Sequence, residues 1–244
     1  MVSGSAALPV PLRHEWERIS GGQILLERYG MSELGMVLSH GLANEDRVEG
    51  TVGLPLPGVN VRLAINDDKT GDEKDVTENM NVSGEIQVKG PNVFKEYWNK
   101  PEATAKEFTA SGWFKTGDTA LRIPPHGFYR ILGRTSVDII KSGGYKISAL
   151  EIERELLGHP QISDAAVCGV EDAEWGQRVG AVVVIKKAED EKALDLESLR
   201  EWMKPRLAAY KIPTLLRVMD EMPRNAMGKV NKKQLVSVFS DNYN

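Results

Sequence analysis

The stretch GRTSVDIIKSGGY, residues 133–145, separates two parts of the chain with different sequence patterns. An arginine is followed by a short polar link, an apolar pair and two glycines, which is typical of a link that leads into a β-hairpin. Gly143 and Gly144 can adopt positive φ angles, so they favour a tight reversal or the close approach of a ligand to the backbone. An ordinary hairpin between domains, with no mechanistic role, fits these residues equally well.

The residues after this stretch have the pattern of a small mixed domain. Ser148 and Glu151 fit the first turn of a capped helix, and Asp195 fits the cap of a second helix. Two apolar runs, residues 162–170 and 179–187, are typical of buried strands. We therefore predict an α+β unit of about a hundred residues, the size of a small domain.

The residues before this stretch predict mainly β-structure. Residues 59–65 alternate between apolar and polar side chains and predict a half-buried strand, and residues 84–90 predict another. The polar, acidic residues 66–83 between them predict an exposed hairpin loop. Pro101 fits the first turn of a short helix.

The composition narrows the class of protein. The chain has 244 residues, 41% hydrophobic and 27% charged, as in soluble globular proteins. A net charge of −4 argues against a nucleic-acid partner, and no apolar run approaches the roughly 20 residues of a membrane span. The single cysteine, Cys168, lies in the apolar run AAVCGV, so we predict a small core residue rather than a nucleophile.

A buried run at residues 24–26 is followed by three polar side chains, Tyr29, Ser32 and Glu33, which we expect in a loop. A hydroxyl and a carboxylate after a strand end can hold Mg²⁺ and contact phosphate. Ser32 can equally cap a helix, with Glu33 favoured by the helix dipole.

Two further segments are candidates for a ligand site. Small residues at 3–6 leave backbone accessible to a flat ligand, although a plain turn explains them as well. The residues GWFKTGD, 112–118, place Asp118 between two strand-like pieces. This carboxylate can bond to backbone as a structural acid, or it can accept hydrogen bonds from the hydroxyls of a ribose.

Five motifs stand in a characteristic order along the chain: GSA at 4–6, YGMSE at 29–33, GWFKTGD at 112–118, GR…GG from Gly133, and PRNAMGK at 223–229. The last is not a phosphate-binding P-loop, because the required glycine and Ser/Thr are missing. The ordered set resembles the adenylate-forming superfamily, which includes acyl-CoA synthetases. The resemblance implies an α+β fold: a β-rich C-terminal part of the large AMP-binding domain (1–133), then a small mobile lid domain (134–244) with its hinge near 134–138.

The resemblance also implies roles in nucleotide binding. Glu33 would hold Mg²⁺ and Ser32 would contact the α-phosphate, while Lys229 would bridge the acyl carboxylate and the α-phosphate during adenylation. The ATP site would further include Gly4, Ser5 and Ala6 along the adenine, Tyr29 stacked on the ring, Gly30 beside it, Asp118 on the ribose hydroxyls, and Arg134 on ribose and phosphate. The implied cofactors are ATP, Mg²⁺ and coenzyme A.

The second half-reaction involves the central stretch of the chain. By the same resemblance, Gly143, Gly144 and Tyr145 would form the channel for the pantetheine arm of CoA. Ser136 and Val137 would act as the hinge, where the superfamily usually has Asp or Lys. The superfamily's Gly/Ser/Thr-rich phosphate loop is not found in these 244 residues, so we expect the N-terminal portion of the same fold to be required for activity.

Several phrases resemble the malonyl-CoA synthetase family in particular, among them GTVGLPLPGV, FKEYWNKPEAT and GRTSVDIIKSGGYKISALE. Arg28, directly before Tyr29, is the specific feature, because a cation there can pair with the distal carboxylate of a dicarboxylic acid. A solvated arginine at a strand end is the alternative. The resemblance implies an enzyme of the mitochondrial matrix; a cytoplasmic location is the other possibility.

The sequence leaves other functions open. The chain fits the C-terminal part of an ATP-dependent acid–thiol ligase, for malonate or for another short acid. A fragment retained as a non-catalytic structural or partner-binding subunit is a second hypothesis, and an adenylation domain that loads a carrier protein is a third. The presence of Lys229, Glu33, Asp118 and Arg134 favours the ligase.

Overall fold

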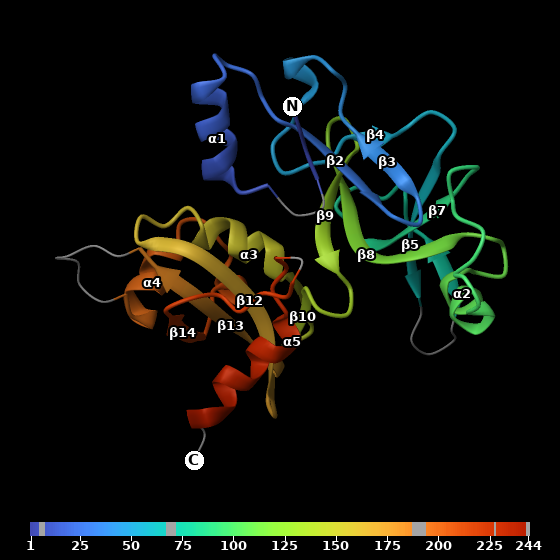
Figure 1. Cartoon of the computed structure of the whole chain (residues 1–244). Helices are drawn as coiled ribbons and strands as arrows, with labels where there is room; N and C mark the ends of the chain where they lie inside the picture. Colours follow the sequence, from blue (N-terminus) through green and yellow to red (C-terminus); the bar gives the residue numbers. More distant parts are fainter. Residues whose placement is uncertain (5–7, 67–71, 187–193, 227, 243–244) are drawn as a thin grey trace. The chain divides into compact units, whose positions relative to one another are not determined.

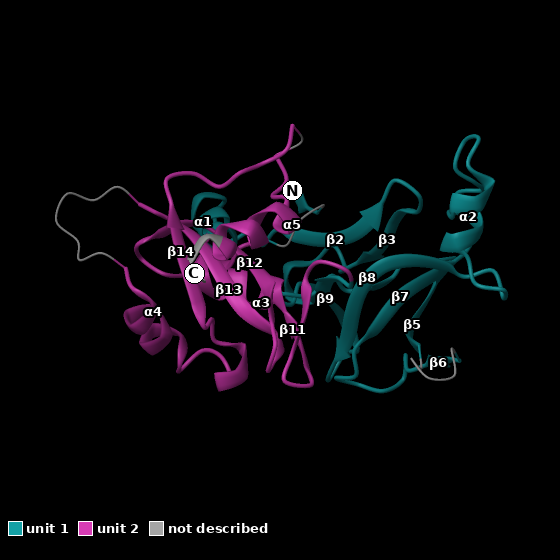
Figure 2. Ribbon diagram, turned by 90° about the horizontal axis from the view of Figure 1, so that it is seen from below, with its two compact units in different colours: residues 1–8, 12–135 teal, residues 9–11, 136–244 magenta. Residues whose placement is uncertain are grey.

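The computed structural model of the chain describes residues 1–4, 8–66, 72–186, 194–226 and 228–242 (Figure 1). The chain forms two compact units, residues 1–8 with 12–135, and residues 9–11 with 136–244 (Figure 2). Each unit has its own β-sheet structure and its own hydrophobic core, and helices accompany the strands. The predicted α+β class is confirmed.

The first sheet of the first unit consists of four short strands in sequence order: β1 (Val2–Ser3), β2 (Leu26–Met31), β3 (Gly35–Ser39) and β4 (Leu54–Pro55). Strand β1 is parallel to β2, and the other neighbours are antiparallel. Helix α1 (Val10–Ile19) connects β1 to β2, and the 3₁₀ turn η1 (Asn44–Asp46) lies between β3 and β4 along the chain.

The loop predicted after the apolar run at residues 24–26 is in part a strand. Strand β2 continues through Tyr29 and Gly30, which pair with Leu38 and Met36 of β3. The prediction was wrong here because the chain turns at residues 32–34 into β3, whose backbone supplies the partners that extend β2. Gly30 is required at this position, since a Cβ atom would lie 2.1 Å from the carbonyl oxygen of Gly35.

The second sheet of the first unit is antiparallel throughout. Its spatial order is β6 (Glu73–Asp75), β5 (Asn60–Asn66), β7 (Gly84–Lys89), β8 (Phe114–Ile123) and β9 (Phe128–Arg134). The strands predicted at 59–65 and 84–90 are confirmed as β5 and β7. Helix α2 (Pro101–Glu107) begins at its proline, as predicted.

Asp118 lies inside a strand rather than between two strand-like pieces. Strand β8 runs without interruption past Gly117, although this glycine has a φ of +70°. The expected break was wrong because β8 has hydrogen-bonded neighbours on both sides, β7 and β9. Residue Asp118 pairs with Arg134 in the register of β8 and β9.

The second unit contains one mixed sheet. Its main order is β11 (Tyr145–Ser148), β10 (Ile139–Ser142), β13 (Gly176–Ile185) and β12 (Ile162–Asp172), with β14 (Leu215–Met219) parallel to β13. The helices are α3 (Ala149–Leu156), α4 (Leu196–Met203) and α5 (Lys232–Leu235), accompanied by the 3₁₀ segments η2 (Ala209–Lys211) and η3 (Val236–Asn242).

Both predicted helix starts of the second unit are confirmed. The Ser148 hydroxyl accepts a hydrogen bond from the Glu151 N–H at 3.2 Å, and the Asp195 carboxylate accepts one from the Ser198 N–H at 2.8 Å. Helix α4 ends at Met203, two residues before Pro205.

Both faces of this sheet are buried. Residues of α3 and α4, including Ile152 and Leu199, share one apolar cluster with alternate residues of β12 and β13. On the other face, Leu235 and Phe239 share a second cluster with Cys168. Burial on both faces explains why β12 and β13 appear in the sequence as continuous apolar runs.

Cys168 is a core residue, as predicted. It is 2% exposed, and burial raises the pKa of its thiol to about 11.

Among the described residues, no helix combines the length and the apolar character needed to cross a lipid bilayer.

Candidate active site

Three of the predicted nucleotide-binding side chains meet in the first unit. The Tyr29 hydroxyl donates a hydrogen bond to Oδ2 of Asp118 at 2.7 Å. Arg134 Nε lies 3.1 Å from Oδ1 of the same carboxylate. The strands β2, β8 and β9 therefore bring together residues from three distant segments around one acid.

The two partners of Asp118 differ in their exposure to solvent. Tyr29 is buried, and burial, followed by the charge of Asp118, raises the pKa of its phenol far above the ordinary value. Arg134, in contrast, is 58% exposed, while the Asp118 side chain is 11% exposed. The phenol is therefore a permanent donor near neutral pH, and the guanidinium remains accessible to a ligand.

The backbone around Asp118 is held by its neighbours. Thr116 Oγ1 accepts a hydrogen bond from the Asp118 N–H at 3.1 Å and donates one to the carbonyl of Ile86 at 2.8 Å. The Gly117 N–H donates to Oε1 of Glu85 at 3.1 Å. Burial raises the pKa of Glu85. No motif in the sequence singled out Glu85, which resembles an ordinary residue of a half-exposed strand.

The structure places Gly4 beside the strand that carries Arg28 and Tyr29. Strand β1 pairs with β2, and a Cβ atom on Gly4 would lie 3.3 Å from the Arg28 carbonyl oxygen. Ser5 and Ala6 lie outside the described residues. A glycine at this position allows the two backbones to approach closely.

Glu33 is fixed by a segment that sequence analysis did not identify as functional. The Tyr97 hydroxyl donates to Oε1 of Glu33 at 3.0 Å, and the Phe94 N–H donates to the Glu33 carbonyl at 2.8 Å. Burial and the Glu33 carboxylate raise the pKa of Tyr97 to about 12. The signal was present in the phrase FKEYWNKPEAT, but a tyrosine there has no distinctive spacing. Ser32 is exposed in the adjoining turn.

The residues present fit a magnesium ion held together with a nucleotide. Among the described residues, no three His, Cys, Asp or Glu side chains converge to form a metal cluster. Magnesium commonly uses one or two carboxylates together with substrate phosphates and water. Glu33 has one carboxylate oxygen engaged by Tyr97 and belongs to a half-exposed residue, so it suits that type of binding.

Arg28 lies inside strand β2 and not at a strand end. The residue is half-buried on β2, where it pairs with Ser39 of β3. Its Nε atom is buried and has no hydrogen-bond partner among the described residues. This nitrogen can donate to an anion, and the Nε atoms of Arg13, Arg47, Arg130 and Arg154 are likewise buried without a partner among the described residues.

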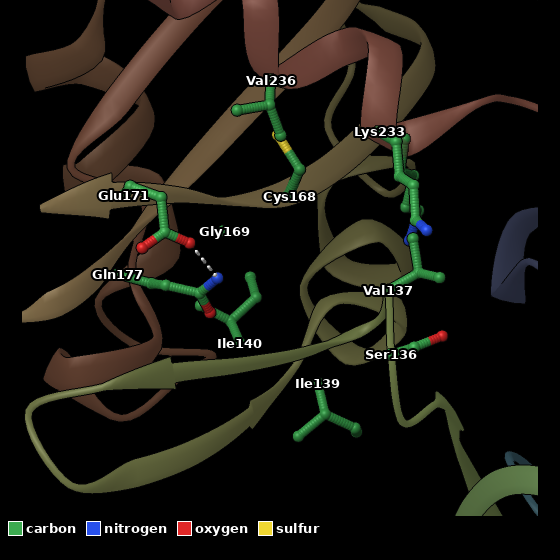
Figure 3. Close-up of a pocket in the computed structure, with 11 residues that line it drawn as sticks. Ser136, Val137, Ile139, Ile140, Cys168, Gly169, Glu171, Gln177, Lys233 and Val236 are labelled. Carbon is green, nitrogen blue, oxygen red and sulfur yellow. Dashed lines mark hydrogen bonds between the residues drawn. The ribbon is translucent and has the colours of Figure 1, made fainter.

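The link after Arg134 is a turn that opens the second unit. Residues 135–138 form this turn, and Ser136 and Val137 line a hollow of about 260 Å³ together with residues of β12, β13 and α5 (Figure 3). At one side of this hollow, Gln177 Nε2 of β13 donates to Oε1 of its neighbour Glu171 on β12 at 3.0 Å. The predicted hinge residues thus contribute to a surface of the second unit.

The double glycine forms the two-residue turn of the β10–β11 hairpin. Ser142 pairs with Tyr145, and both Gly143 and Gly144 have positive φ angles, +54° and +83°. The predicted hairpin is confirmed. Tyr145 is 54% exposed, and its ring stacks on that of Tyr210 with centroids 4.2 Å apart.

Lys229 is exposed at the end of a short hairpin loop in the second unit. Its N–H donates to Oδ1 of Asn225 at 2.9 Å, and its carbonyl accepts from the Asn225 N–H at 2.8 Å. Arg224 and Val230 form an isolated antiparallel bridge at the base of the loop. These contacts fix the backbone of Lys229 relative to Asn225, and Lys229 itself is exposed.

Comparison with known proteins gives the family. Residues 1–98 match the model of AMP-binding enzymes, and residues 151–229 match the model of the AMP-binding enzyme C-terminal domain. A CoA ligase of Gibberella moniliformis is 51% identical over 98% of the chain and 44% of its own length. The mitochondrial malonate–CoA ligase ACSF3 of Xenopus laevis is 54% identical over 98% of the chain and 42% of its own length.

A solved structure gives the same result. The crystal structure of ATP-bound MatB from Rhodopseudomonas palustris aligns with the whole chain, with a TM-score of 0.83 and 39% identity. The alignment covers 46% of that structure, so the chain spans less than half the length of these relatives. The two models together cover most of the chain, which therefore belongs to the AMP-binding enzymes and corresponds to a C-terminal portion of these relatives.

Proposed function

We propose that the chain is the C-terminal part of an ATP-dependent ligase that joins malonate, or a related short dicarboxylic acid, to coenzyme A. The observation that carries this proposal is Arg28, whose buried Nε has no acceptor among the described residues. A second carboxylate on the substrate would supply that acceptor. The name of one relative, malonate–CoA ligase, supports the same substrate class.

The first unit would bind the nucleotide. Asp118, oriented by Tyr29, would accept hydrogen bonds from the ribose hydroxyls, and the exposed guanidinium of Arg134 would contact ribose or phosphate. The backbone surface along the adenine would come from Gly4, Ser5, Ala6 and Gly30, and Tyr29 would lie against the ring. Ser32 would donate to the α-phosphate.

Adenylation would transfer AMP to the acid. A carboxylate oxygen of the acid attacks the α-phosphorus of ATP, and the bond to pyrophosphate breaks. Magnesium, when held by Glu33 and the phosphates, supplies charge neutralisation at the transferring group. Lys229 would donate to the oxygens on which negative charge increases, which lowers the free energy of the transition state.

Thioester formation would use the second unit differently. The CoA thiol, losing its proton, attacks the acyl carbon, and AMP leaves. Gly143, Gly144 and Tyr145 would line the channel for the pantetheine arm, and rotation at Ser136 and Val137 would exchange this hairpin for the Lys229 loop. We also propose a location in the mitochondrial matrix, because the Xenopus relative is a mitochondrial protein.

The test is the exchange of labelled pyrophosphate into ATP by the full-length enzyme with malonate, succinate, acetate or no acid. The proposal expects exchange that depends on malonate, and malonyl-CoA when CoA is added. Exchange with every acid at equal rates would contradict the dicarboxylate assignment. Activity with a carrier-protein thiol but not with CoA would contradict the choice of acceptor.

A further inference from the structure

A buried cluster of three charged side chains lies next to the Lys229 loop in the second unit. Lys232, the first residue of α5, forms ion pairs with Asp138 and with Glu153, the latter at 2.7 Å between Nζ and Oε1. The three side chains are 10%, 13% and 14% exposed, in that order. Lysine is rarely buried to this extent unless it is paired.

The cluster joins four elements of the second unit. Asp138 is the last residue of the turn that contains Ser136 and Val137, and its carbonyl accepts from the first N–H of α3 at 2.8 Å. Glu153 lies on α3, and its Oε1 also accepts from the Val167 N–H of β12 at 2.7 Å. One ammonium group therefore connects the link, α3 and, through Glu153, β12 to the start of α5.

The charges of this buried cluster are balanced only when all three side chains are present. Burial by itself lowers the pKa of Lys232, but the Glu153 and Asp138 carboxylates outweigh this effect, and the net shift is upward. Burial raises the pKa of Glu153, and Lys232 offsets that shift only in part. Without the ammonium, two acids of like charge would share a poorly solvated site.

Lys232 is also close to Lys229 along the chain, with only Val230 and Asn231 between them. Three residues span at most about 10 Å of extended chain, so the position of Lys232 limits where Lys229 can lie. Val230 is bridged to Arg224, which reinforces the outgoing arm of the loop. A displacement of α5 would therefore move Lys229 as well.

We propose that Lys232 is a positioning residue for Lys229. Its ion pair with Asp138 would tie the segment that carries Lys229 to the link, residues 135–138. Rotation of the link would then carry Lys229 with it. The inference rests on the proposed role of Lys229 in adenylation. It goes beyond that role because it assigns a residue and a contact that hold the loop in place.

The test uses the full-length enzyme and an acid that the wild type adenylates, so a wrong choice of substrate does not affect it. Lys232→Met removes the ammonium but keeps most of the stem. Lys233→Met is the matched control, because Lys233 is the next residue of the same helix and is exposed. Both variants are assayed for pyrophosphate exchange and for thioester formation from the ready-made acyl-adenylate, and their unfolding midpoints are measured.

We expect Lys232→Met to lower pyrophosphate exchange about a hundredfold, since small misplacements of catalytic groups have effects of that order. Thioester formation should stay within about threefold of wild type, because that step does not require Lys229. Lys233→Met should leave both steps unchanged. An equal loss in both half-reactions would overturn the proposal.

A second variant separates position from stability. The triple substitution Lys232→Met, Asp138→Asn and Glu153→Gln removes the uncompensated charges and should recover the unfolding midpoint. If Lys232 positions Lys229, exchange stays low in this stable variant. If exchange recovers together with stability, the cluster serves folding alone and the proposal is wrong.

Discussion

The Tyr29 hydroxyl donates a 2.7 Å hydrogen bond to Asp118, a residue 89 positions further along the chain. Tyr29 belongs to the first sheet of its unit and Asp118 to the second. This contact joins the two sheets at the point where the proposed ribose acceptor lies. It also orients the Asp118 carboxylate, with the exposed Arg134 beside it.

We predict that Tyr29→Phe weakens both the fold and nucleotide binding. A hydrogen bond to a charged acceptor contributes about 1.5–3 kcal/mol, so the free energy of unfolding should fall by that order. The KM for ATP should rise, because Asp118 loses the donor that orients it. Urea unfolding and initial rates at varied ATP concentration, both with the full-length enzyme, measure the two effects.

Tyr129→Phe is the matched control for this prediction. Tyr129 is 2% exposed in the core of the same unit and lies near Arg122 rather than near the proposed site. Its variant should leave the KM for ATP unchanged. If both variants change that KM by the same factor, the Tyr29–Asp118 contact supports the fold without a separate role in nucleotide binding.

Lys229→Ala should abolish adenylation and spare the second half-reaction. Loss of one group that stabilises transition-state charge typically costs 10²–10³ in rate. Lys229 is exposed, and alanine keeps the backbone N–H that bonds to Asn225, so the substitution should not lower the stability of the fold. A loss of activity would therefore come from the missing ammonium group. Pyrophosphate exchange and thioester formation from ready-made acyl-adenylate distinguish the two steps, and equal losses in both would contradict the assignment.

Local signals in the sequence predicted the elements that have strong local causes. The caps at Ser148 and Asp195, the proline at the start of α2 and the glycine turn at residues 143–144 all follow from the chemistry of a few adjacent residues. The extension of β2 through Tyr29 and Gly30 could not be predicted this way. It depends on antiparallel pairing with β3, the next strand along the chain, which no single residue of the motif indicates.

The contacts of the candidate site also separate into features with a local signal in the sequence and features that depend on how the chain folds. Asp118 and Glu33 were identified from their motifs, but their partners Tyr29 and Tyr97 depend on how distant segments meet. The buried pairing of Lys232 with Asp138 spans 94 positions of sequence. A lysine in a basic run resembles a solvated residue, and only the packed structure shows that this one is buried.

Cys168 provides a pH-dependent prediction. The thiol has a pKa of about 11 in the fold, against an ordinary value of 9.0. Below pH 9 it is protonated in both states, and between pH 9 and 11 only the unfolded chain loses the proton. The stabilising contribution is therefore fully present below pH 9 and lost as the pH rises through about 11, a change of about 2–3 kcal/mol.

Thiol labelling and the pH dependence of stability both measure this prediction. A thiol reagent such as DTNB should label the folded full-length enzyme slowly at Cys168 at pH 8 and rapidly after denaturation in urea, once other cysteines of the longer protein are replaced. Cys168→Ala should show a smaller decrease in unfolding free energy between pH 9 and 11 than the parent. Identical pH dependence in the two proteins would show that burial does not protect the thiol.

The central claim is that the ligase activates a dicarboxylic acid whose second carboxylate binds Arg28. The substitution Arg28→Met in the full-length enzyme tests this claim most directly. The measurement is kcat/KM for CoA-thioester formation with malonate and with acetate, at saturating ATP. The buried guanidinium nitrogen, which has no partner in the described part of the chain, should meet the second carboxylate of malonate. Its loss should lower kcat/KM for malonate at least about tenfold, or about 1.4 kcal/mol. Acetate has no second carboxylate, so its kcat/KM should change little. If both acids lose activity by the same factor, Arg28 maintains the fold or the nucleotide site, and the dicarboxylate assignment is contradicted.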